Sequence, residues 1–197
     1  CYKTEDKIDW NAKTSHKFVK MVLDRGHESV IEHESISVKI ICDRGVTHEI
    51  VRHRLVAYSQ ESTRYCNYKS GVTFVIPPWC LDIGEGEYNR HDLRNEHLST
   101  TTIFWVKHML NCEEVYIYLL SSGWSPQQAR SVLPNSLKTE IVMTANIREW
   151  RHILKLRTSK ATHPQMREIM IPLLKEFQEC IGVVFDDIYE SEEIVEI

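Results

Sequence analysis

The segment from Arg52 to Tyr65 carries the side chains best suited to chemistry in this sequence. It places three arginines, one histidine, two tyrosines and three hydroxyl residues within fourteen positions. A guanidinium group offers a planar fork of donors that matches phosphate or carboxylate oxygens, and hydroxyl groups can fill the remaining oxygen positions. The segment therefore predicts a site for an anionic ligand, although a solvated basic face would also explain the three residues at its start.

A second cluster runs from Asn146 to Arg157. A strand is expected to end and a helix to begin at Asn146, and the free backbone N–H groups of such a junction favour anions. Arg148 lies in the first turn of this helix, where a cation opposes the helix dipole. Its position there is explained either by a bound ligand or by an exposed guanidinium that pairs with Glu149 or with solvent. His152 shares a helix face with Arg148 because it follows four residues later.

Two shorter segments are weaker candidates. Residues 26–33 join a helix to a strand, and His27, Ser29 and His33 can either stabilise that turn or bind a ligand. Arg130 lies in a short helical segment and is ordinary by itself. No Gly-x-Ser-x-Gly, Gly-x-Gly-x-x-Gly, Walker loop or His-Glu-x-x-His occurs, so a protein nucleophile, a glycine-rich nucleotide cradle and a metal site are not expected.

The composition sets the broad class. A chain of 197 residues suits one domain, residues 1–197, and the net charge of −4 argues against a nucleic-acid partner. No run approaches 18 consecutive apolar residues, so no membrane association is expected. The six cysteines form no Cys-x-x-Cys pair and no basic-then-apolar leader opens the sequence, which together favour reduced thiols and a cytoplasmic location.

The elements that must position these side chains alternate between helix and strand. In the first half we expect a helix over 14–25 capped by Ser15, a strand over 36–41, a turn at 43–45, a helix from a Thr47 cap to about 55, a loop over 58–68 and a strand over 72–76. In the second half we expect a surface loop over 84–89, helices over 95–121 and from Ser125, a strand over 137–145, a helix from Asn146 to about 157, and a last helix from Pro164 bent at Pro172. These predict a single α+β domain with a mixed or antiparallel central sheet flanked by helices.

The spacing of the arginine segment also matches a family motif. Arg52-His53-Arg54, seven residues, Ser62, one residue and Arg64 resembles the signature of flavin-dependent thymidylate synthases. Gly26-His27-Glu28 precedes it, and Arg130-Ser131-Val132-Leu133-Pro134, Asn146-x-Arg148 and Arg157 follow it in the family's order, so the resemblance extends from Cys1 to Cys180. It implies reductive methylation of dUMP to dTMP with FAD, 5,10-methylenetetrahydrofolate as carbon donor and NADPH as reductant. It also implies a homotetramer with shared active sites and no protein nucleophile.

The resemblance assigns roles to individual positions. Arg157 is the implied catalytic residue, because it stabilises negative charge at the pyrimidine edge. The implied dUMP ligands, chiefly for its phosphate, are Glu49, Arg52, Gln60, Glu61, Ser62, Thr63, Arg64, Arg130 and Arg157. The implied FAD ligands are His27, Ser29, Arg52, His53, Arg54, Gln60, Asn146, Arg148 and His152.

The sequence departs from the family pattern at several positions. Glu49 stands where relatives often carry glutamine, so it binds the sugar or base edge or points away from the phosphate. Gln60 replaces a glutamate and His152 an asparagine. The family's N-terminal strand is expected to be missing from this sequence.

Two other functions remain open from the residues alone. The arginine segment with Tyr58, Tyr65 and Tyr68 is also compatible with a small RNA- or nucleotide-binding module, in which the tyrosines stack on bases. A third hypothesis is that the protein is a catalytically inactive structural homologue of the flavin-dependent thymidylate synthases.

Overall fold

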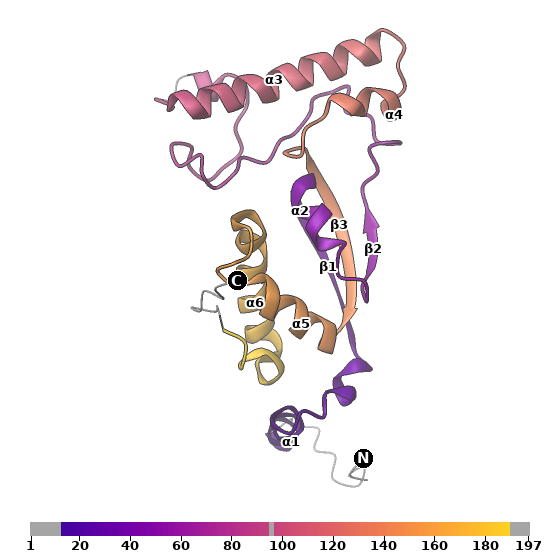
Figure 1. Ribbon diagram of the computed structural model, residues 1–197, viewed down its shortest axis with the longest axis vertical. Helices are drawn as coiled ribbons and strands as arrows, with labels where there is room; N and C mark the ends of the chain where they lie inside the picture. The colour runs from indigo at the N-terminus through magenta and orange to yellow at the C-terminus, as the bar shows by residue number, and fades with distance from the viewer. Residues whose placement is uncertain (1–12, 95–96, 190–197) are drawn as a thin grey trace. The chain divides into compact units, whose positions relative to one another are not determined.

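The protein is an α+β fold built on three strands. The computed structural model describes residues 13–94 and 97–189. Its elements are α1 (Lys13–Asp24), η2 (Glu28–Glu32), β1 (Ser35–Asp43), α2 (Arg44–Ile50), β2 (Ala57–Gln60), η3 (Asp92–Arg94), α3 (Thr100–Ser121), α4 (Pro126–Ala129), η4 (Arg130–Val132), β3 (Lys138–Asn146), α5 (Ile147–Arg157) and α6 (Pro164–Phe185), the η elements being 3-10 helices. The antiparallel sheet has the order β1-β3-β2, so β3 is the central strand (Figure 1). The expected α+β class is confirmed.

The residues group into two compact units, which we describe separately. The first unit comprises residues up to 38, residues 53–57 and residues from 143 onward. The second unit comprises residues 39–52 and 58–142. Strands β1 and β3 contribute residues to both.

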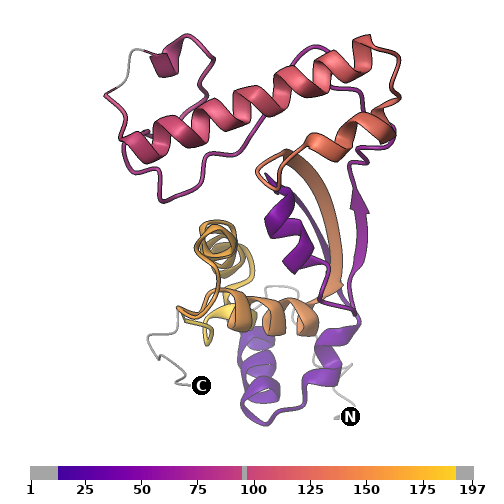
Figure 2. The ribbon, with the colours of Figure 1, turned by 45° about the horizontal axis from the view of Figure 1, so that its top comes forward.

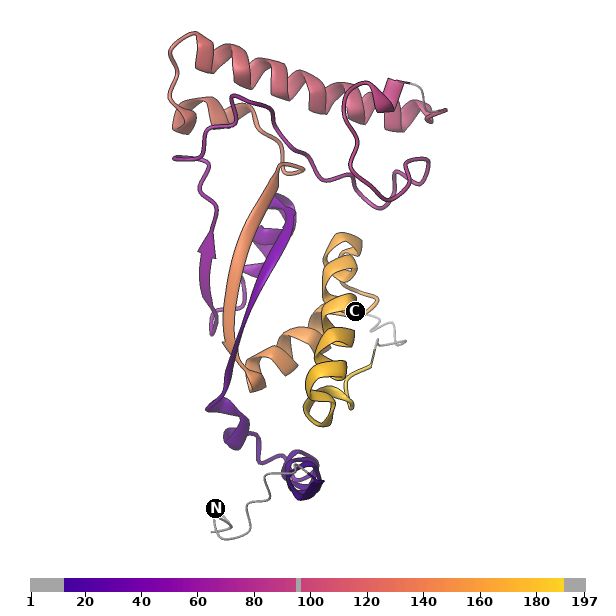
Figure 3. The same cartoon turned by 180° about the vertical axis from the view of Figure 1, so that it is seen from behind.

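The first unit has its core where α5 packs on α6 (Figure 3). Trp150 of α5 is fully buried and meets Phe177 of α6 edge to face, with ring centroids 5.4 Å apart. Its indole N–H donates to the carbonyl of Ile36 in β1 at 3.0 Å. This one aromatic residue therefore ties α5 to both a helix and a strand.

The second unit is dominated by α3, with α4 beside it (Figure 2). Ser99 caps α3 by accepting from the backbone N–H of Thr102. A small core lies along this helix, with buried Cys80, Ile83 and Val106 covered by Ile76, Tyr88, Leu93, Leu98, Trp105 and Leu110. No helix of the described residues is long and apolar enough to cross a membrane.

The start of α2 differs from the sequence prediction. We expected a turn at 43–45 and a cap at Thr47, but Asp43 is the N-cap, since its Oδ1 accepts from the N–H of Val46 at 2.7 Å. The helix consequently ends at Ile50, before Arg52, His53 and Arg54. These three residues follow α2 and do not form its last turn.

Other local predictions have mixed outcomes. The capping box at Ser125 and the cap by Asn146, which accepts from the N–H of Glu149 at 2.8 Å, are confirmed. The strand expected at 72–76 is reduced to one bridge between Phe74 and Leu137. Ser15 lies inside α1 and is not its cap. In α6, the non-helical backbone lies at Ile181 and not at Pro172.

Candidate functional site

The residues predicted to bind ligands divide between the two units. The second unit holds Glu49, Arg52, Gln60, Glu61, Ser62, Thr63, Arg64 and Arg130. The first unit holds His27, Ser29, His53, Arg54, Asn146, Arg148, His152 and Arg157.

An open hollow of about 460 Å³ lies in the second unit. Its lining residues are Arg44, His48, Thr63, Gln127, Arg130, Ser131, Leu133, Pro134, Asn135 and Leu137. Two are arginines, one is a histidine and none is acidic. We refer to this feature as the arginine hollow. It contains two of the predicted ligand residues, Thr63 and Arg130.

Arg44 and His48 were missed by the sequence prediction. They lie four residues apart on α2, so they share a helix face. The Nη1 atom of Arg44 is buried and has no hydrogen-bond partner among the described residues. A cation and a histidine at helical spacing were a usable signal, but the misplaced start of α2 concealed it.

Arg130 is positioned by a buried hydroxyl group. Its Nη1 donates to Oγ1 of Thr63 at 3.1 Å, and Thr63 is only 4% exposed. Arg130 itself is exposed at the start of η4. The hydroxyl fixes one edge of the guanidinium beside the hollow.

Gln60 and Glu61 are held by neighbouring protein groups. The Nε2 of Gln60 donates to Oγ1 of Thr47 at 3.0 Å and lies 3.4 Å from Oγ1 of Thr139. Glu61 accepts from the hydroxyl of Tyr68, with Oε1 and the phenol oxygen 2.5 Å apart. Burial, and then this bond to Glu61, raise the pKa of Tyr68 above its ordinary value.

The remaining predicted nucleotide ligands do not line the hollow. Arg52 and Arg64 are exposed, and the guanidinium of Arg64 lies 5.4 Å from the ring centroid of Tyr65. The carbonyl of Ser62 accepts from the N–H groups of Tyr65 and Cys66, which makes a tight turn. Glu49 is half-buried near the end of α2.

In the first unit, His53 is the centre of a second cluster. Its Nε2 accepts from Nε of Arg157 at 2.9 Å, and its ring meets His152 edge to face at 6.2 Å. Burial, then the charges of Arg157 and His152, lower the pKa of His53 to about 4. His53 is therefore neutral at pH 7. The carboxylate of Glu149, 3.9 Å from Nδ1, then faces a ring N–H and does not form an ion pair.

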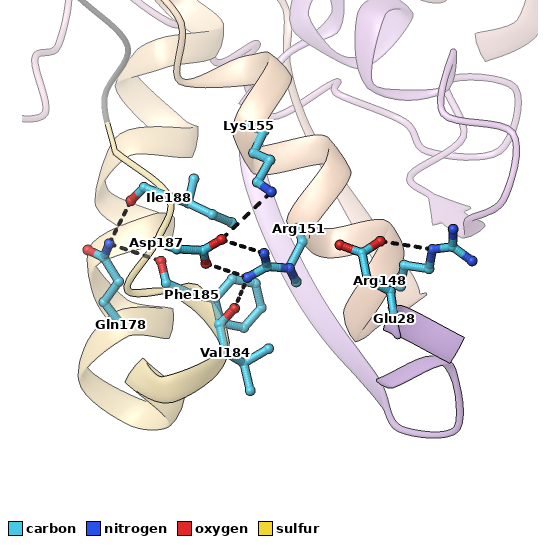
Figure 4. A network of polar contacts seen from close by, with 9 residues as sticks. All are labelled: Glu28, Arg148, Arg151, Lys155, Gln178, Val184, Phe185, Asp187 and Ile188. Carbon is cyan, nitrogen blue, oxygen red and sulfur yellow. Dashed lines mark hydrogen bonds and ion pairs between the residues drawn. The ribbon is translucent and has the colours of Figure 1, made fainter. Parts of the chain in front are cut away.

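Arg148 is paired with two acids of η2. Its Nε lies 3.2 Å from Oε2 of Glu28 (Figure 4). Its Nη1 bonds to Glu32. The bond to Glu32 is the main cause that raises the pKa of Arg148. These carboxylates, and not Glu149, account for a cation in the first turn of α5. His27 precedes η2 and Ser29 lies within it, and both are exposed, as is Arg54.

Four thiols, those of Cys42, Cys80, Cys112 and Cys180, lie in environments that disfavour the thiolate. Cys42, Cys66, Cys80, Cys112 and Cys180 are free. Burial, with a contribution from Asp43, raises the pKa of Cys42 to about 12. Burial also raises the pKa values of Cys80, Cys112 and Cys180. Nucleophilic catalysis by these four thiols is disfavoured, because the thiolate is the reactive form.

The fold and these clusters define an α+β protein that presents arginine and histidine side chains able to bind an anionic ligand. Residues 1–181 match the family model described as Thymidylate synthase complementing protein. A protein of Mycobacterium avium called flavin-dependent thymidylate synthase is 32% identical over 188 residues, which cover 95% of this chain and 75% of that protein. Proteins of the same name in Mycobacterium tuberculosis and Mycolicibacterium vanbaalenii are 31% and 33% identical, with the same coverage. The chain belongs to the flavin-dependent thymidylate synthase family.

Proposed function

We propose that this chain is an enzyme that catalyses the reductive methylation of dUMP to dTMP with FAD. The observation that carries the proposal is the buried Nη1 of Arg44, which has no hydrogen-bond partner within residues 13–94 and 97–189, in a hollow for which the structure describes no acidic lining residue. A buried charged donor without an acceptor is unfavourable by about 1–3 kcal/mol or more. A nucleotide phosphate would supply the missing acceptor oxygens.

Four arginines and a serine would share the phosphate. Arg44 and Arg130 border the arginine hollow, and the family motif adds Arg52, Ser62 and Arg64. Arginine suits this task because its fork of donors can contact two phosphate oxygens at once. Gln60, Glu61 and Thr63 complete the nucleotide-binding set, while Glu49 would contact the sugar or base.

Arg157 would act on the uracil ring. Its Nε donates to the neutral His53, which fixes the orientation of the guanidinium group. A preoriented cation stabilises negative charge that develops on the pyrimidine during the reaction. No protein nucleophile is required in this scheme.

The donor set of the first unit fits a dinucleotide with a pyrophosphate group. His27, Ser29, Arg54 and His152 are exposed donors, and Arg148 is half exposed. These residues, with His53 and Asn146, would hold FAD, and the family resemblance also assigns Arg52 and Gln60 to FAD. When bound, reduced FAD supplies the hydride that reaches the uracil ring. The protein's own part is to bind, orient and polarise.

The remaining components follow from the family resemblance. NADPH would reduce the flavin and 5,10-methylenetetrahydrofolate would donate the carbon. The 197 residues would act as one domain in a cytoplasmic homotetramer with shared active sites.

The test is dUMP-dependent turnover. Protein loaded with FAD is mixed with NADPH and methylenetetrahydrofolate, and dTMP is quantified by chromatography with and without dUMP. We expect dTMP only when dUMP and FAD are both present. A flavin-loaded protein that forms no dTMP would refute the proposal.

A further inference from the structure

The loop at residues 61–68 is fixed at both ends. The N–H of Glu61 donates to the carbonyl of Glu140 in β3 at 2.9 Å. At the other end, the N–H of Tyr68 lies 3.4 Å from the hydroxyl oxygen of Tyr116, a fully buried residue of α3. One end of the loop is thus tied to the sheet and the other to a helix.

A side-chain bond also joins the two ends directly. The Tyr68 hydroxyl donates to Oε1 of Glu61 at 2.5 Å across seven positions. The other oxygen of Glu61 lies 4.0 Å from Nζ of Lys138. Because the pKa of Tyr68 is raised, its hydroxyl remains a protonated donor at neutral pH.

The loop carries groups that face an anionic ligand in the proposed function. Within it, the N–H groups of Tyr65 and Cys66 donate to the carbonyl of Ser62 at 3.0 and 2.9 Å. Thr63 is buried and accepts from Arg130. A shift of the loop would move Thr63, and Arg130 with it.

We propose that Tyr68 is a positioning residue for nucleotide binding, because its bond to Glu61 closes the loop and holds Ser62, Thr63 and Arg64 in place. Through Thr63 it also aims Arg130 at the phosphate. This inference rests on the proposed function. Closing the loop before the ligand arrives lowers the ordering cost of binding, so Tyr68 acts on affinity more than on the chemical step.

The test compares Tyr68→Phe with the wild type. Removing the hydroxyl should raise the dUMP KM about tenfold, equivalent to about 1.4 kcal/mol, with kcat changed less than about twofold. Hydrogen exchange at the amides of Tyr65 and Cys66 should accelerate, because their turn is less restrained. The matched control is Tyr88→Phe, which removes a hydroxyl bond to the carbonyl of Gly84 in another loop of the same unit. It should leave the dUMP KM unchanged.

Tyr116→Phe separates closure of the loop from its attachment to α3. It removes the acceptor for the N–H of Tyr68 and leaves the Glu61 bond intact, so its effect on KM should be the smaller one. An equal or larger effect would overturn the assignment to the side-chain bond. So would an active wild type whose dUMP KM is unchanged by Tyr68→Phe. A wild type that forms no dTMP would refute the proposed function itself, and the inference with it.

Discussion

The arginines of α5 and those of the arginine hollow meet opposite surroundings. On α5, Arg148 pairs with Glu28 and Glu32. The 4%-exposed Arg151 bonds to both carboxylate oxygens of Asp187 at 2.6 Å (Figure 4). In the hollow, Arg130 contacts a hydroxyl, and Nη1 of Arg44 is buried without a hydrogen-bond partner among the described residues, as Nε of Arg151 also is. The difference is that no acidic residue is among the described ones that line the hollow. Carboxylates of the protein compensate the charges of Arg148 and Arg151. The charges of Arg130 and Arg44 lie beside no acidic lining residue of the hollow.

At buried positions, this difference separates a structural arginine, Arg151, from a ligand-binding one, Arg44. Arg148 is half exposed, so its ion pairs leave it accessible for the FAD role proposed above. A buried cation with a carboxylate contributes to the fold, and its loss leaves an unpaired charge. A buried guanidinium nitrogen without an acceptor is unfavourable until an anion arrives, so its presence indicates a binding role. The two regions therefore predict opposite responses to the same substitution.

Arg157 lies on α5 but bonds to the neutral His53. Its substitution therefore tests whether an arginine of α5 can have a ligand-binding role. Arg157→Ala should reduce kcat about 10²–10³-fold, the usual loss for a preorganised charge-stabilising donor. FAD content should change little, and Arg157→Lys should recover only part of the rate. Steady-state kinetics measure kcat, and flavin absorbance measures the FAD content. Normal flavin content, normal Tm and near-wild-type turnover would show that Arg157 is not catalytic.

Arg151 tests the structural side of the comparison. Arg151→Gln should destabilise the protein by about 2–3 kcal/mol, less than a fully buried pair because Asp187 is half exposed. Thermal unfolding should show a Tm lower by roughly 5–10 °C.

The control is in the same network. Lys155 lies 3.8 Å from Asp187 but is half exposed, so Lys155→Gln should change the free energy of unfolding by less than about 1 kcal/mol. Equal losses of unfolding free energy in both variants would mean that burial does not determine how much these ion pairs contribute to stability.

Arg44 tests the opposite side. Arg44→Gln should raise the dUMP KM about tenfold or more, as expected for a lost hydrogen bond to a charged group. The Tm should be unchanged or higher, because the substitution removes a buried guanidinium nitrogen that has no hydrogen-bond partner among the described residues. The matched control is Arg90→Gln in the same unit, since Arg90 is paired with Glu113 and Glu114. A fall in Tm with an unchanged KM in Arg44→Gln would reverse the assignment.

The last prediction is a pH dependence at His53. Its pKa is about 4 in the folded protein and about 6.5 in an unfolded chain, so the folded state binds the proton more weakly. The stability linked to His53 is fully present above pH 6.5 and is lost as the pH falls from 6.5 through 4. His53→Gln keeps an acceptor for Arg157 without a titrating ring. Urea unfolding of both proteins from pH 7 to 4 should show the wild type losing stability relative to the variant, and parallel curves would rule this out.

The local parts of the fold were predictable from the sequence. The helices opened by Ser125 and Asn146 follow from capping residues within three positions, and the alternation of Ile36, Val38 and Ile40 gave the strand. The start of α2 was not predictable in the same way, because Asp43-Arg44-Gly45 suits a turn as well as a cap. The wrong cap concealed the shared face of Arg44 and His48.

The candidate site was predictable as a set of residues but not as a set of contacts. Motif spacing pointed to Arg130 and Thr63, yet the bond between them spans 67 positions. The partners of Arg148 lie more than a hundred positions away, as its bond to Glu32 shows. Local patterns carry no information about such pairs, so the sequence offered only a ligand, Glu149 or solvent as the partner of Arg148.

The contacts of Arg151 have a consequence for synthesis of the chain. Its carboxylate partner Asp187 lies 36 positions later, and the carbonyl of Val184, which also accepts from it, lies 33 positions later. A nascent chain that docked α5 too early would bury an uncompensated guanidinium. We therefore expect the first unit to become protease-resistant only after Asp187 has left the ribosome, although domains otherwise begin folding from the N-terminus. Ribosome-stalled chains that expose residues up to 180 or up to 189 would reveal this late step as a sharp gain in resistance.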